Sequence, residues 1–111
     1  MSVNLQAFQA VQDFRRRLEA RWPGRILDVR IFGSVARGEA REDSDLDVFV
    51  MTDTDDDSLT RGIVEVAYDI SDQHDLTWWL TPFIRSRERF EELQRRERLI
   101  AADIMREGIP V

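Results

Sequence analysis

Apolar residues near the start of the chain recur at three- and four-residue steps, the spacing of one face of an α-helix. They are Ala7, Phe8, Val11, Phe14, Leu18 and Trp22. The pattern predicts an amphipathic helix over Val3–Trp22, which the Pro23-Gly24 pair ends.

Two short runs rich in β-branched and aromatic residues follow, Ile26–Phe32 and Leu46–Met51. Gly33-Ser34 breaks the first run before a turn or short helix that reaches Gly38, and a polar loop leads into the second. We expect these runs to be neighbouring strands of one sheet.

The second half of the chain shows further helix and strand signals. An acidic run at 53–57 precedes apolar residues at helical spacing, so we interpret the acids as a helix start, which the helix dipole favours, and not as a metal site. Leu76–Ile84 is interpreted as a third strand ended by Pro82, with Ser86 as the cap of the next helix. Two helical stretches complete the chain, and Gly108 is expected to end the last one.

The adjacent residues Trp78 and Trp79 fall within this predicted third strand. Neighbouring residues of a strand point to opposite faces, so one ring is expected to face the core and the other a covering helix.

The composition suits one globular domain over residues 1–111, with 42% apolar residues. No stretch is long and apolar enough to span a membrane, and 1–13 lacks a leader pattern, so a cytoplasmic protein is expected. The chain has no cysteine, so any metal must be held by oxygen ligands. The net charge of −6 argues against general binding to nucleic acid.

Asp45 and Asp47 lie two residues apart at the start of a predicted strand, so both carboxylates point to one face of the sheet. Two such carboxylates repel each other unless a cation lies between them. Mg²⁺ suits this position because it takes a few carboxylates together with phosphate oxygens and waters. The pair predicts a magnesium site that also holds a nucleotide.

Phosphate contacts are predicted just upstream. Gly33 lies where a strand turns into a helix, and its missing side chain lets a phosphate approach the backbone. Ser34 adds a hydroxyl donor, and Arg37 follows one turn later with a fork of donors. Phosphoryl-type transfer needs mainly positioning and charge neutralisation, often by two metal ions.

Gly33-Ser34, ten intervening residues and Asp45-Leu46-Asp47 together resemble the motif of the minimal nucleotidyltransferases of the DNA polymerase β superfamily. Ala36-Arg37-Gly38 and the strand Val48-Phe49-Val50 also agree with that family's usual sequence. The resemblance implies an α/β (α+β) fold in which helices flank a small mixed β-sheet. It also implies a triphosphate on Gly33 and Ser34, and two Mg²⁺ ions on Asp45 and Asp47.

The family also uses a third carboxylate, on a later strand, that helps to bind the catalytic metal and activates the acceptor hydroxyl. Asp75, in His74-Asp75-Leu76-Thr77, resembles that position, although a histidine precedes it. Asp69 and Asp72 lie nearby and are assigned to the preceding helix or its end. The resemblance therefore assigns catalysis and metal binding to Asp45, Asp47 and Asp75.

Two functions stay open at this level. One is an enzyme of the EC 2.7.7 type that moves a nucleoside monophosphate, expected to be AMP from ATP, to a hydroxyl on a partner protein. The other is a catalytically inactive binding module that masks a partner. Small members of the family often act as antitoxins beside a helical HEPN protein, so a HEPN-type partner is expected. The donor base, the acceptor and any homo-oligomer stay undetermined.

Overall fold

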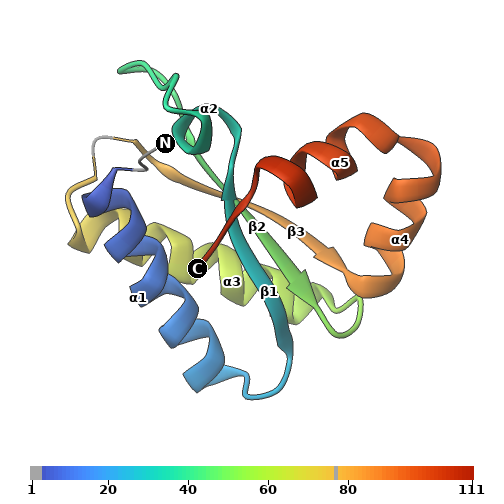
Figure 1. Cartoon of the computed structure of the whole chain (residues 1–111). Helices are drawn as coiled ribbons and strands as arrows, with labels where there is room; N and C mark the ends of the chain where they lie inside the picture. Colours follow the sequence, from blue (N-terminus) through green and yellow to red (C-terminus); the bar gives the residue numbers. More distant parts are fainter. Residues whose placement is uncertain (1–3, 77) are drawn as a thin grey trace.

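The computed structural model describes residues 4–76 and 78–111 (Figure 1). The helices are α1 (Leu5–Arg21), α2 (Gly33–Arg37), α3 (Asp57–Gln73), α4 (Arg87–Arg96) and α5 (Arg98–Glu107), and the strands are β1 (Ile26–Phe32), β2 (Leu46–Thr52), β3 (Leu80–Ser86) and β4 (Ile109–Pro110). The strands form a mixed sheet in the order β3-β2-β1-β4. β1 is antiparallel to β2 and β4, whereas β2 and β3 are parallel. The predicted fold class is confirmed.

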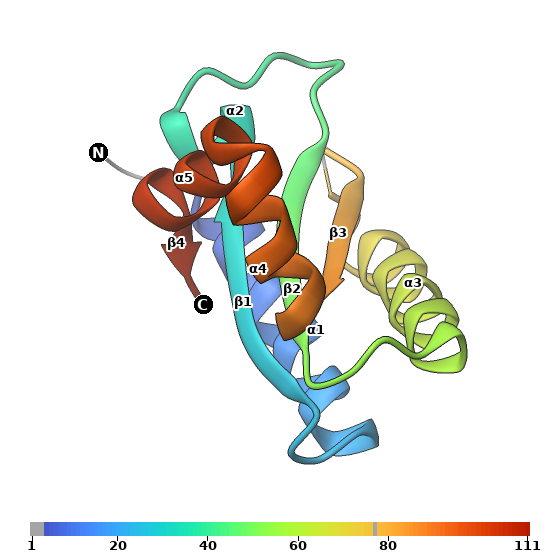
Figure 2. The ribbon, with the colours of Figure 1, turned by 90° about the vertical axis from the view of Figure 1, so that its right-hand side faces the viewer.

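Helices cover both faces of the sheet, α1 and α3 on one face and α4 and α5 on the other (Figure 2). Leu46, Val48 and Val50 of β2 are buried in the larger core with α1 and α3. Phe49 points the other way and packs with Phe90 and other buried residues of α4 and α5. Burial on both faces explains why β2 reads as a nearly continuous apolar run.

Side chains cap most of the helices as the sequence indicates. Asn4 accepts a hydrogen bond from the Ala7 N–H at the start of α1, and the predicted start at Val3 lies outside the described residues. Ser86 accepts from the Arg89 N–H, so its predicted capping role is confirmed. Gly108 ends α5 with an extended backbone conformation. None of the described helices has the length and apolar character to cross a bilayer.

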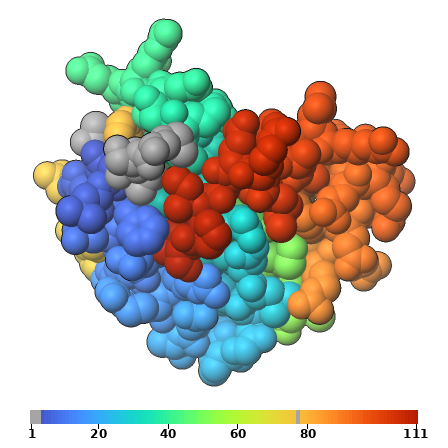
Figure 3. All heavy atoms as spheres, in the orientation of Figure 1, coloured from blue at the N-terminus to red at the C-terminus, as the bar shows by residue number. Residues whose placement is uncertain are grey.

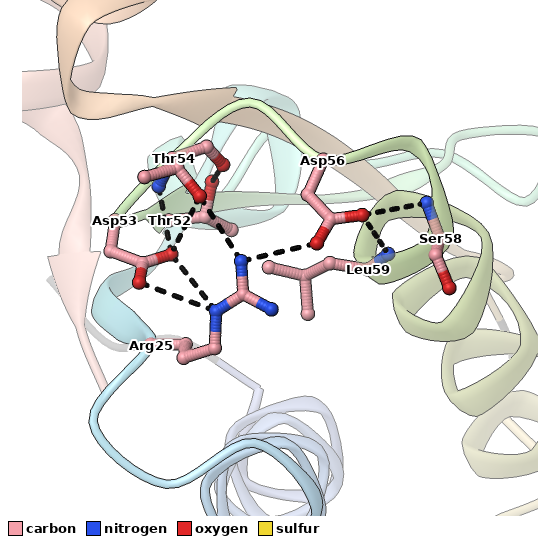
Figure 4. A network of polar contacts seen from close by, with 7 residues as sticks. All are labelled: Arg25, Thr52, Asp53, Thr54, Asp56, Ser58 and Leu59. Atoms are coloured by element: carbon pink, nitrogen blue, oxygen red, sulfur yellow. Dashed lines mark hydrogen bonds and ion pairs between the residues drawn. The ribbon is translucent and has the colours of Figure 1, made fainter.

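The acidic run before α3 forms the polar network of Figure 4. Asp56 accepts from the Ser58 and Leu59 N–H groups, and this contact with Leu59 contributes most to lowering the pKa of Asp56. Arg25, at the start of β1, pairs with Asp56 at 3.3 Å and with Asp53 at 3.2 Å. The run therefore caps α3 and ties it to β1, in agreement with its interpretation as a helix start.

The predicted bounds of the third strand are wrong. β3 begins at Leu80 instead of Leu76, and Pro82 lies inside it instead of ending it. In the parallel ladder the Leu46 N–H donates to the Trp79 carbonyl. The backbone N–H and C=O groups of odd-numbered residues of β3 therefore point toward β2, whereas the backbone of Pro82 points away from it. A proline is tolerated there because the outer side of an edge strand needs no donor for the ladder.

Both tryptophans precede β3, so the prediction that they alternate across a strand is also wrong. Trp78 packs against the larger core, and its indole N–H donates to the Arg41 carbonyl at 2.7 Å. Trp79 is 47% exposed and lies beside Tyr68 of α3, with ring centroids 5.5 Å apart.

Candidate active site

The site is built where β1 passes into α2. Gly33 has a φ of 75°, which favours glycine. A Cβ atom at this residue would lie 2.4 Å from Oδ2 of Asp47, so a side chain here would require the Asp47 carboxylate to move. Gly33 therefore brings the backbone of the β1–α2 turn against the Asp47 carboxylate.

The two predicted carboxylates lie beside this turn. Asp47 pairs with Phe32 across β1 and β2 and is half-buried, whereas Asp45 is exposed just before β2 begins. Burial raises the pKa of Asp47, the negative charge of Asp45 raises it further, and the positive charge of Arg37 acts in the opposite direction. The unfavourable charge on Asp47 is what a bound cation would neutralise.

These residues fit Mg²⁺ by their chemistry. Carboxylate oxygens are ligands that this ion prefers, and the exposed side of Asp45 leaves room for phosphate oxygens and waters. The described residues contain no group of three or more acidic, histidine or cysteine side chains placed to hold a metal. A metal at Asp45 and Asp47 would thus need further oxygen ligands from a nucleotide or water.

The proposed phosphate contacts surround the same turn. Ser34 is half-buried in the first turn of α2. Arg37, at the end of α2, is exposed, and its guanidinium lies 2.8 Å from Glu39 and 3.5 Å from Glu107 of α5. A triphosphate bound at this turn would have to compete with these two carboxylates for Arg37.

Asp75 is placed elsewhere. It has a φ of 48° and lies directly after α3, not at the start of β3, so its predicted place on the third strand is wrong. The Leu76 N–H donates to the Ser71 carbonyl and the Asp75 N–H to the Asp72 carbonyl, which is the Schellman arrangement that closes a helix end. Asp75 thus has a backbone role, and Thr77 of the same predicted segment lies outside the described residues.

The register of β2 and β3 identifies the actual neighbours of the carboxylate pair. Thr81 is the partner of Asp47, and Leu80 is the partner of Leu46. Because paired residues share a face of the sheet, the exposed Thr81 hydroxyl stands beside Asp47 where a third acid would be expected. Sequence reasoning missed Thr81 because β3 was placed too early. Pro82, whose backbone points away from β2, is the sequence feature that could have corrected the predicted start of β3.

Residues 11–106 match the family model described as a nucleotidyltransferase domain, and the chain belongs to this family. The resemblance identified from the Gly33-Ser34 and Asp45-Leu46-Asp47 motif is confirmed.

A curated relative from Methanocaldococcus jannaschii, described as a "putative protein adenylyltransferase", is 39% identical over 49 residues. That match covers 44% of this chain and 49% of the relative, so it spans about half the relative's length.

Two kinds of solved structure are similar. One described as a "putative minimal nucleotidyltransferase" is 30% identical, covers 98% of this chain and 97% of its own, and has a TM-score of 0.60. A variant of the toxin–antitoxin pair MntA-HpeT is 16% identical and has a TM-score of 0.58, and the match covers 90% of this chain and 70% of that chain. A toxin–antitoxin structure with AMP-PNP is also 16% identical and has a TM-score of 0.58, and the match covers 89% of this chain and 70% of that chain. At this identity the toxin–antitoxin structures show a shared fold alone.

Proposed function

We propose that this nucleotidyltransferase binds ATP together with Mg²⁺ and transfers AMP to a hydroxyl group of a partner protein. The observation that carries the proposal is the packing of Gly33 against the half-buried Asp47, whose pKa is raised mainly by burial and further by the charge of Asp45. Such an arrangement costs stability in the free protein and suits a cation-dependent ligand.

Each residue has a defined part in the proposed reaction. Asp45 and Asp47 hold Mg²⁺, up to two ions, which supplies positive charge that neutralises the triphosphate. The backbone at Gly33, the Ser34 hydroxyl and the Arg37 guanidinium orient the phosphates. The acceptor oxygen forms a bond to the α-phosphorus, the bond from that phosphorus to the bridging oxygen breaks, and pyrophosphate leaves. The acceptor hydroxyl loses its proton to solvent water.

The partner in this proposal is a helical protein of the HEPN type. Similar folds occur in solved toxin–antitoxin pairs, one of them with AMP-PNP, and a Methanocaldococcus jannaschii relative is described as an adenylyltransferase of proteins. These similarities support a nucleotide and a protein as ligands.

The test is transfer of label from ATP carrying ³²P on the α-phosphate to the protein encoded by the adjacent gene. Wild type is expected to label that protein, and Asp47→Asn to abolish labelling. Asp69→Asn, which changes an exposed carboxylate of α3, is the matched control and should behave as wild type. Equal labelling by Asp47→Asn and wild type would contradict the proposed role of Asp47.

One observation favours a second candidate, a binding module without transferase activity: Thr81 and not an acid lies beside Asp47. Thr81→Asp places a carboxylate there, and Thr81→Asn is its control of equal size. If the chain is an enzyme, wild type transfers label and Thr81→Asp transfers it about 10²-fold faster. If wild type binds ATP and transfers nothing, the binding-module function replaces the proposed one.

A further inference from the structure

Two exposed apolar surfaces are bordered by charges of opposite sign, and the one that Thr81 also lines adjoins the candidate site. The first, termed the aromatic patch, consists of Val64, Tyr68, Trp79 and Pro82. The second, termed the basic patch, consists of Arg95, Arg96, Arg98, Leu99 and Ile100, and Glu97 also lines it. Tyr68 and Trp79 are 55% and 47% exposed, and Leu99 is 83% exposed.

The aromatic patch forms a groove of about 250 Å³ between α3 and β3. Glu65 and Asp72 lie three residues before and four residues after Tyr68, so they share its face of α3. Asp69 is exposed beside them. Among the described residues, none of these three carboxylates takes part in an ion pair within 4.0 Å. The groove is therefore apolar, and on its border these three carboxylates outnumber Arg61, which lies four residues before Glu65 on the same face of α3.

The adjoining edge of β3 is closed to a further strand. The Leu80 N–H donates to the Ser71 hydroxyl at 3.0 Å, and Pro82 has no N–H to offer. The Ile84 carbonyl accepts from the Arg85 side chain at 2.7 Å. Since these outward positions offer few free backbone groups, the groove suits inserted side chains better than strand addition.

The basic patch lies at the turn between α4 and α5, on the helix pair that projects from one side of the molecule in Figure 3. Here α5 buries Ala101 and Ile104 in the smaller core and leaves Leu99 and Ile100 outside it. The patch surrounds a hollow of about 560 Å³. Arg96 pairs with Glu92, whereas within the described chain Arg95 and Arg98 have no ion pair.

We propose that the basic patch of one molecule docks on the aromatic patch of a second copy. Leu99 and Ile100 would cover Tyr68 and Trp79, while Arg95 and Arg98 would meet Glu65 and Asp72. Copies with a net charge of −6 repel each other at long range, so a local surface of opposite sign favours this one orientation.

The geometry makes the contact head-to-tail. The basic patch belongs to α4 and α5, on the opposite side of the sheet from α3 (Figure 2), so one molecule cannot join its own two patches. Contacts between two different surfaces form rings or open chains instead of a two-fold dimer. The proposal is independent of the proposed catalytic function.

Sedimentation equilibrium tests the proposal on the full chain. Wild type should show an average mass that rises above the monomer toward about 0.5 mM protein, and this rise should weaken as salt goes from about 0.05 to 0.5 M. Arg95→Glu/Arg98→Glu and Tyr68→Ser should each stay monomeric, with circular dichroism unchanged because all three side chains are exposed.

Mixing the two variants gives the sharpest result. The Tyr68→Ser molecule keeps its basic patch and the arginine variant keeps its aromatic patch, so the mixture should form one-to-one dimers and nothing larger. Adding Glu65→Arg/Asp72→Arg to Arg95→Glu/Arg98→Glu should restore self-association. A monomeric wild type at both salt concentrations, or self-association that survives in either patch variant, would overturn the proposal.

Discussion

Two regions carry aspartates that the resemblance assigned to one catalytic set, and the structure gives these aspartates different surroundings and backbone conformations. At the β1–α2–β2 junction, Asp47 is half-buried against Gly33, and burial raises its pKa. At the α3–β3 junction, Asp75 is exposed and adopts the left-handed conformation that ends α3. An aspartate next to a strand is therefore better evidence for a site when its surroundings destabilise its negative charge and its backbone conformation does not serve to end a helix.

Among variants of these two regions, we expect the largest change in the free energy of unfolding at Gly33. Gly33→Ala combines a positive φ with a contact of 2.4 Å to Asp47, and should destabilise the fold by about 3 kcal/mol in urea unfolding. Gly38→Ala is the control, because its φ is 74° with nothing within 4 Å of the added Cβ atom. It should cost about 1 kcal/mol. Equal costs at both positions would show that the approach to Asp47 has no energetic effect.

Ser34→Ala tests the ligand side of the same junction. Loss of one hydrogen bond to a phosphate should weaken triphosphate binding by about 1 kcal/mol, or roughly fivefold, with little change in stability. Calorimetric titration and thermal unfolding measure the two quantities separately. A large fall in melting temperature with unchanged binding would assign Ser34 to the turn instead of the ligand.

At the other junction, Asp75→Gly should stabilise the protein by about 0.5 kcal/mol or more, because glycine adopts a φ of 48° without strain. Asp75→Asn should change stability little, since asparagine also tolerates this conformation. Neither variant should alter ATP binding. Weaker binding in both would restore Asp75 to the site.

Asp47→Asn should stabilise the metal-free protein by about 0.5 kcal/mol near neutral pH, a figure reduced for solvent screening of a half-buried group. A raised carboxyl pKa means that the folded state binds more protons than the unfolded state. Its stability therefore falls as pH rises from the unfolded pKa through the folded pKa. The difference between Asp47→Asn and wild type in urea unfolding should be small near pH 4 and larger near pH 7. A difference of opposite sign would indicate that Asp47 makes a stabilising ion pair.

Much of the fold, including the turn at Gly33 and the strand that carries Asp47, could be predicted because its determinants are local. The spacing from Gly33-Ser34 to Asp45-Leu46-Asp47 follows from one turn, one loop and one strand. The start of β3 could not be predicted, because it depends on pairing with β2 and on the Schellman turn at Asp75. Leu76 packs against the core as a strand residue would, so its apolar character was consistent with the predicted start of the strand at Leu76.

The central claim is that the Asp45–Asp47 pair holds a cation that joins the nucleotide to the protein. Isothermal titration of the wild-type chain with ATP, in the presence of Mg²⁺ and again with EDTA, tests it directly. We expect binding with Mg²⁺, none detectable with EDTA, and none for Asp47→Asn in either buffer. Equal affinity with Mg²⁺ and with EDTA would contradict the claim.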